Sequence, residues 1–124
     1  MRVGEGALLK PLLEITGPIG AIAATAIGPR ALPVRAILFD KTAERHWALC
    51  WHQDRTIVVR ERIDDPGFGP WTVKSGLIQA EPPFKTLERM VKVRVHLDPV
   101  DASNAPLRIV PGSHRLGRLP EGEV

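Results

Sequence analysis

The sequence predicts a mainly β protein, with an antiparallel sheet of barrel or sandwich type that follows two helices. Alanine and leucine dominate the first 30 residues, which favours helix there. From Pro33 onward, short runs rich in valine, isoleucine and tryptophan alternate with breaks, as half-buried strands do. Twelve prolines and eleven glycines in 124 residues predict numerous turns and argue against a helical bundle.

The two helices are expected within residues 4–15 and 18–28. The second begins at Pro18, a residue favoured in the first turn of a helix, and ends at Gly28. The uncharged run 15–28 is shorter than the ~20 apolar residues of a membrane span, and glycine and proline interrupt it. We therefore expect a buried helix or helix pair and no membrane segment, with a secretory signal as the less favoured alternative.

Five segments have the composition of strands. The clearest of them, residues 88–98, alternates apolar and polar side chains along its length. Residues 64–71, "DDPGFGPW", are expected to form a loop, and "VPGS" at 110–113 suits a type II turn with proline second and glycine third. The predicted strands are 34–40, 46–54, 56–62, 88–98 and 105–110.

The charge of the chain indicates the kind of partner, and its cysteine content indicates the compartment. The net charge is +3, and the 17 basic residues are scattered, so no nucleic-acid partner is called for and a small-molecule substrate is expected. The one cysteine, Cys50, cannot form an internal disulfide, which favours a reducing compartment such as the cytoplasm. Between leucine and tryptophan, Cys50 itself is expected to be a small buried hydrophobe.

The run "ALCWHQDRTIVV" holds the main candidate site. Alternate side chains of a strand point to the same side, so His52 and Asp54 are predicted to converge while Gln53 faces away. An imidazole and a carboxylate are two of the three ligands in the 2-His-1-carboxylate triad that holds non-haem iron(II). On the residues alone, an ion pair of Asp54 with Arg55 or Arg60 is an open alternative.

Several motifs, in order, resemble the phytanoyl-CoA dioxygenase family of iron(II)- and 2-oxoglutarate-dependent oxygenases. They are "LFDKT", "WHQD", "PGFGPW", "RVHLD", "SNAPL" and "PGSHRLG", between about Ala36 and Leu119. The resemblance implies a double-stranded β-helix, the cupin-like jelly roll, with a metal at one mouth of the barrel. It implies Fe(II), with 2-oxoglutarate as co-substrate, and hydroxylation of a small organic substrate. Residues 1–124 would be one domain, with a helical segment over 1–30 and the jelly-roll portion over 34–119.

The resemblance also assigns residues. His52 and Asp54 match the first histidine and the carboxylate of the metal triad. Two basic residues, Arg94 and Lys41, are expected to face 2-oxoglutarate. Trp71 and Gln79 are expected to contact the substrate. Gln79 stands where close relatives often carry histidine.

The family pattern places a further histidine, and an arginine that grips 2-oxoglutarate, downstream of "PGSH". Neither follows before Val124, so we expect a truncated chain with an incomplete site and an open sheet edge that favours self-association. His46, His96 and His114 are expected to be solvated or structural. Whether this chain alone is an enzyme stays open, and the alternative is a non-catalytic jelly-roll remnant or binding module. An unrelated basic β-domain that binds an anionic polymer is disfavoured, because the sequence has no contiguous basic patch.

Overall fold

The computed structural model describes residues 6–41, 49–120 and 122, which divide into two compact units. The first unit comprises the described residues up to Leu38 together with Thr56–Arg94. The second comprises those of Phe39–Arg55 and those from Val95 onward. Within the described residues, no helix is both long and apolar enough to cross a membrane.

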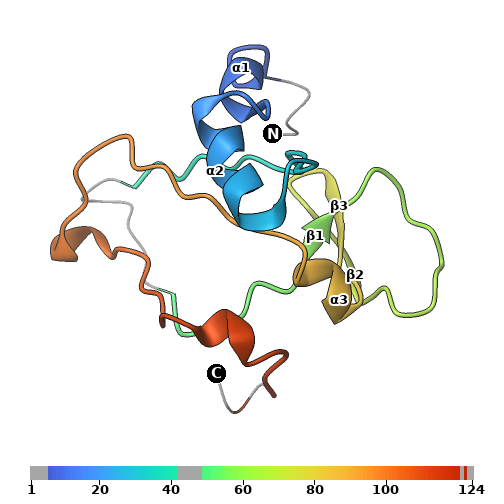
Figure 1. Cartoon of the computed structure of the whole chain (residues 1–124). Helices are drawn as coiled ribbons and strands as arrows, with labels where there is room; N and C mark the ends of the chain where they lie inside the picture. The colour runs from blue at the N-terminus through green and yellow to red at the C-terminus, as the bar shows by residue number, and fades with distance from the viewer. Residues whose placement is uncertain (1–5, 42–48, 121, 123–124) are drawn as a thin grey trace. The chain divides into compact units, whose positions relative to one another are not determined.

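Two helices open the first unit, as the composition predicted (Figure 1). α1 spans Lys10–Leu13 and α2 spans Pro18–Ile27. Proline occupies the first turn of α2, and the helix ends at Gly28, whose φ of 96° lies in the region that favours glycine. The expectation of a buried helix pair was wrong: α1 buries no residue, and α2 buries only Gly20. α2 packs against α1.

The sheet of the first unit has three antiparallel strands in the order β1-β3-β2. β1 spans Ile57–Val58, β2 spans Trp71–Lys74 and β3 spans Leu77–Ala80. The β2–β3 hairpin turns at Ser75 and Gly76, both with positive φ, which is the requirement of a type I′ turn. Sequence reasoning missed this hairpin, although a serine–glycine pair between two β-prone runs could have indicated it.

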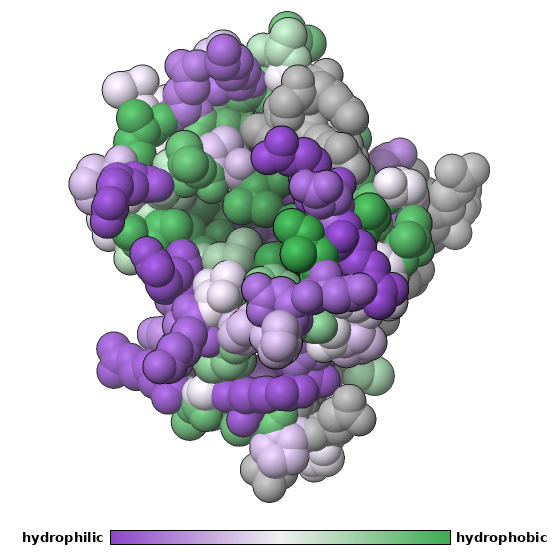
Figure 2. All heavy atoms as spheres, turned by 90° about the vertical axis from the view of Figure 1, so that its right-hand side faces the viewer, coloured by the Kyte–Doolittle hydropathy of each residue, from purple (hydrophilic) through white to green (hydrophobic). Residues whose placement is uncertain are grey.

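The buried cluster of the first unit is centred on β3. Ala80 is fully buried, and Leu77 and Gln79 are nearly so, because β3 has a neighbour on each edge. A short helix, α3 (Phe84–Leu87), follows the sheet. Elsewhere hydrophobic side chains reach the surface (Figure 2), and Leu32 is 81% exposed. The apolar surface that this unit buries is therefore small.

Most of the predicted strands do not form. Residues 34–40, 88–98 and 105–110 contain no strand, and neither do residues 49–54, the described part of 46–54. Of the predicted strand 56–62, only Ile57–Val58 forms a strand, namely β1. Alternating valines make a segment suitable for a strand, but a strand also needs a hydrogen-bonded neighbour, and in the described sheet β3 alone has one on both edges. Leu97, one of the alternating apolar residues of 88–98, is accordingly 75% exposed.

Turns and single helical turns make up the second unit. The type II turn at 110–113 is confirmed: Gly112 has φ 82° and ψ −7°, and the Ser113 amide donates to the Val110 carbonyl at 3.2 Å. It leads into the 3₁₀ turn η3 (Ser113–Arg115). The predicted loop in the first unit is also confirmed over residues 64–70, and Trp71 already belongs to β2.

A further 3₁₀ turn of the second unit, η2 (Ala102–Asn104), is capped by a carboxylate, so its stability should depend on pH. The Asp101 carboxylate accepts hydrogen bonds from the Ser103 hydroxyl at 2.6 Å and the Ser103 amide at 2.8 Å. The hydroxyl first, and the amide second, hold the pKa of Asp101 below its ordinary value. Because the folded pKa is the lower one, the cap stabilises the turn above the unfolded pKa of about 3.9, and this contribution is lost as pH falls through the folded pKa.

A carboxyl-carbon NMR titration should therefore place the pKa of Asp101 below its ordinary value. Ser103→Ala removes the larger cause and should move that pKa upward. An identical titration curve in the variant would show that the hydroxyl does not stabilise the carboxylate.

Candidate metal centre

His52 and Asp54 lie beside each other in the second unit. His52 Nε2 is 3.8 Å from Asp54 Oδ1, and the side chains are 42% and 56% exposed. The segment is not part of a strand, yet its alternate side chains still meet on one side. The distance exceeds that of a hydrogen bond, so the two groups face each other without a direct bond between them.

A backbone hydrogen bond determines which nitrogen of His52 faces the carboxylate. His52 Nδ1 lies 2.8 Å from the carbonyl oxygen of Cys50. Since a carbonyl only accepts, Nδ1 carries the hydrogen, and neutral imidazole then presents the lone pair of Nε2 on the Asp54 side. Metal-bound histidines usually donate their other ring N–H to a carbonyl or carboxylate in this way. The expectation that Cys50 is buried was wrong: its thiol is exposed.

The separation of the pair lets both side chains reach a single divalent ion. Nitrogen and oxygen ligands bind an ion such as zinc at about 2.0–2.2 Å, so atoms 3.8 Å apart can both reach one ion. Their donor set, one imidazole and one carboxylate, is also that of non-haem iron(II) sites. The residues of this pair therefore fit a metal ion.

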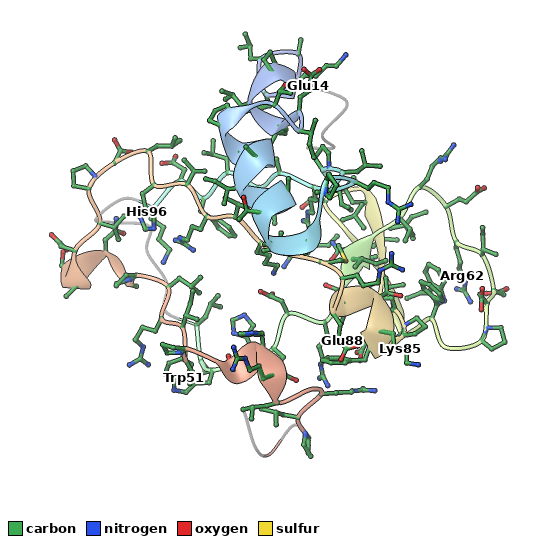
Figure 3. The ribbon with its side chains drawn as sticks, viewed as in Figure 1. Glu14, Trp51, Arg62, Lys85, Glu88 and His96 are labelled. Atoms are coloured by element: carbon green, nitrogen blue, oxygen red, sulfur yellow. The ribbon has the colours of Figure 1, made fainter. Side chains whose placement is uncertain are left out.

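No third ligand joins the pair in the part of the chain that the structure describes. Among the described side chains, no group of three or more histidine, cysteine, aspartate or glutamate residues is placed to hold a metal. His96 lies apart from Trp51, the neighbour of His52 (Figure 3). His114 is exposed at η3, and His46 lies outside the described residues. The described geometry thus provides two of the three protein ligands that a facial triad needs.

Lys41 is held at a strained turn in the second unit. Its Nζ donates a 2.6 Å hydrogen bond to the carbonyl of Ala105, which follows η2. Ala105 has φ 40° and ψ 64°, in the left-handed region where glycine is the usual residue. The alanine of "SNAPL" is therefore strained at this turn. The bond fixes the Lys41 ammonium, an expected 2-oxoglutarate contact, against this turn.

Ala105→Gly should stabilise the chain slightly. A left-handed backbone costs an L-residue roughly 1–2 kcal/mol, and glycine avoids this cost. Glycine also makes the unfolded chain more flexible, which lowers the unfolding free energy by about 0.4–1 kcal/mol. The expected net gain in unfolding free energy is therefore about 0.5–1 kcal/mol, measured by urea denaturation. Ala102→Gly, in the same turn but without positive φ, should destabilise instead. A loss in both variants would contradict the assignment of strain to Ala105.

The other predicted site residues belong to the first unit. Trp71 is half-buried at the start of β2, with Phe68 stacked at a centroid distance of 6.4 Å and the Arg62 guanidinium 5.5 Å from its ring (Figure 3). Gln79 is 5% exposed, and its Nε2 has no hydrogen-bond partner among the described residues. Arg94 is exposed in the segment after α3. Trp71 therefore anchors the preceding loop, and Gln79 lies within the sheet.

Sequence reasoning missed two contacts beside the metal pair. Gln53 Nε2 donates to the Gly117 carbonyl at 2.8 Å, and Gln53 Oε1 accepts from the Leu119 amide at 2.9 Å. The Arg108 guanidinium lies 4.8 Å from the centre of the Trp51 ring. Alternation indicated only that Gln53 faces away from His52, and nothing in the local sequence identifies a partner more than 60 residues away.

The chain matches a known protein family. The family described as "Phytanoyl-CoA dioxygenase (PhyH)" matches residues 22–123, which include the His52–Asp54 pair and both of its flanking contacts. Neither a curated protein nor a solved structure matches the chain.

Proposed function

Because the chain belongs to the phytanoyl-CoA dioxygenase family, we propose that it acts in iron(II)- and 2-oxoglutarate-dependent hydroxylation of a small organic substrate. The observation that carries the proposal is the pair His52 and Asp54, with Nε2 and Oδ1 3.8 Å apart and Nδ1 bound to the Cys50 carbonyl. Family membership supports the class of chemistry, and this geometry supports the residues that would hold the ion.

His52 and Asp54 would be two ligands of the facial triad. His52 contributes a neutral nitrogen that the Cys50 carbonyl orients, and Asp54 contributes a negative oxygen that offsets part of the charge of the ion. When bound, iron(II) with 2-oxoglutarate and oxygen supplies oxidation of an unactivated C–H bond. The protein supplies ligand geometry and the positioning of both substrates.

The remaining assignments belong to the same proposal. The chain would form a cupin-like jelly-roll portion over 34–119 after a helical segment over 1–30. Basic side chains, Lys41 and Arg94, would attract the carboxylates of 2-oxoglutarate. Trp71 and Gln79 would contact the substrate, and for Gln79 the unpartnered buried Nε2 supports a polar contact. We also propose a cytoplasmic location and self-association through the open edges of β1 and β2.

The test is succinate formation from 2-oxoglutarate by the whole chain, with and without iron(II) under oxygen. Iron-dependent succinate, reduced at least about 100-fold in Asp54→Ala, is the expected result, because the variant loses a metal ligand. Asp98→Ala is the matched control, since it removes an exposed carboxylate of the same unit. Turnover that persists in Asp54→Ala would contradict the assignment of the site.

A second candidate is a non-catalytic binding module of the same family. It is favoured by the finding that no third ligand joins His52 and Asp54 among the described residues. Such a module would bind a divalent ion through the pair and form no succinate. Metal-induced stabilisation without turnover would identify it.

A further inference from the structure

The side-chain amide of Gln53 bridges two distant parts of the second unit. It donates to the carbonyl of Gly117 and accepts from the amide of Leu119, at 2.8 and 2.9 Å. A residue in a parallel strand makes the same two bonds with residues on either side of its partner. The Gln53 side-chain amide thus supplies the donor and the acceptor that the backbone of one residue in a neighbouring strand would supply. We refer to these two bonds as the Gln53 clamp.

The clamp lies opposite the metal pair. Gln53 is half-buried, whereas His52 and Asp54 on either side of it are exposed and approach each other. Three consecutive side chains therefore point to two sides, with the clamp on one and the pair on the other. Rotation of this backbone segment about its own axis would move His52 and Asp54, and it would also break both bonds of the clamp.

The local chain is built around the clamp. Gly117 has φ 69°, a conformation that favours glycine and that sets the direction of the carbonyl that accepts from Gln53. Next to the clamp, the Trp51 ring lies 4.8 Å from the Arg108 guanidinium, which ties the residue before His52 to a further segment of the unit. The segment that carries the pair is thus held on both sides of His52, although it belongs to no strand.

We infer that Gln53 is a positioning residue for the metal pair: its clamp to Gly117 and Leu119 fixes the backbone rotation that aims His52 and Asp54 at one ion. The inference rests on the proposed function, because it assumes that this pair binds the metal. Gln53 does not touch the ion, and it acts through the residues on either side of it. Both functions of the amide are required, the N–H₂ as a donor and the oxygen as an acceptor.

The amide-to-carboxylate change tests this requirement. Gln53→Glu keeps the size of the side chain but sets an acceptor against the Gly117 carbonyl, so one bond of the clamp is lost. The added negative charge by itself would attract a cation, whereas loss of positioning weakens binding, so the two effects have opposite signs. We expect the Kd for Mn(II), used alone as a redox-stable probe, to rise about tenfold or more, as for other groups that orient metal ligands.

Two further variants separate positioning from charge and from folding. Thr56→Glu adds the same charge at an exposed residue outside the clamp and should bind Mn(II) at least as tightly as the unmodified chain. Gly117→Ala disturbs the clamp from its other end and should weaken binding similarly, with no further loss in the Gln53→Ala background. In the metal-free chain, Gln53→Ala should also reduce protection of the Leu119 amide from hydrogen exchange.

The outcomes distinguish this inference from the proposed function. If Gln53→Glu binds Mn(II) as tightly as the unmodified chain while His52→Ala does not bind, Gln53 has no positioning role and the metal pair stands. An equal loss in Thr56→Glu would also overturn the inference, because the loss would then not depend on the clamp. If the unmodified chain and His52→Ala bind Mn(II) alike, or neither binds, the proposed metal pair itself is wrong, and the inference falls with it.

Discussion

His52→Ala should lower the affinity of the chain for iron(II) at least about 100-fold. Loss of a group that merely orients a ligand costs about 10–100-fold, and His52 is proposed as a ligand itself. The structure gives the reason for choosing this residue. Its Nδ1 is engaged by the Cys50 carbonyl, so Nε2 is the nitrogen left with a lone pair, and Nε2 is the atom 3.8 Å from Asp54.

Thermal unfolding under anaerobic conditions measures this effect. A ligand that binds only the folded chain raises its stability by RT ln(1 + [L]/Kd), so iron(II) should raise the melting temperature of the unmodified chain in a concentration-dependent way. The rise should disappear in His52→Ala. The matched control is His114→Ala, an exposed histidine of the same unit, which should keep it. Equal loss in both variants would indicate a different ligand set, with His114 as part of it.

The local features of the site could be predicted from the sequence, because they depend on neighbouring residues. Convergence of His52 and Asp54 follows from the alternation of side chains, and the turn at 110–113 follows from proline and glycine in the correct order. Each of these features is determined within a few residues.

The features that sequence reasoning missed depend on residues far apart in the chain. The segment 88–98 has the alternation of a strand but forms none, because no described segment pairs with it through a series of backbone hydrogen bonds. The Gln53 clamp joins residues more than 60 positions apart, and composition cannot indicate such a pair. Pairing of distant segments decides which β-prone runs become strands, and it also decides what holds the metal pair in place.

Gly20→Ala should destabilise the first unit by about 2–3 kcal/mol, the opposite of its effect in an isolated helix. Alanine is favoured over glycine by about 1 kcal/mol in a helix interior. In this structure, however, a Cβ at position 20 would overlap the backbone carbonyl of Glu14 and lie 2.7 Å from the carbonyl oxygen of Leu13. Both obstacles are backbone atoms, which cannot turn away as a side chain can, so α1 would have to separate from α2.

Urea unfolding followed by circular dichroism distinguishes packing from helix propensity. Ala26→Gly, at an exposed position of α2, measures the propensity term alone and should cost about 1 kcal/mol. If Gly20→Ala instead raised the unfolding free energy by that amount, the chain at Leu13 and Glu14 could not lie against α2. A loss of 2–3 kcal/mol would show that the close approach at Gly20 holds the helix pair together. Glycine would then be required at position 20 because even a methyl group there would overlap the backbone of the neighbouring segment.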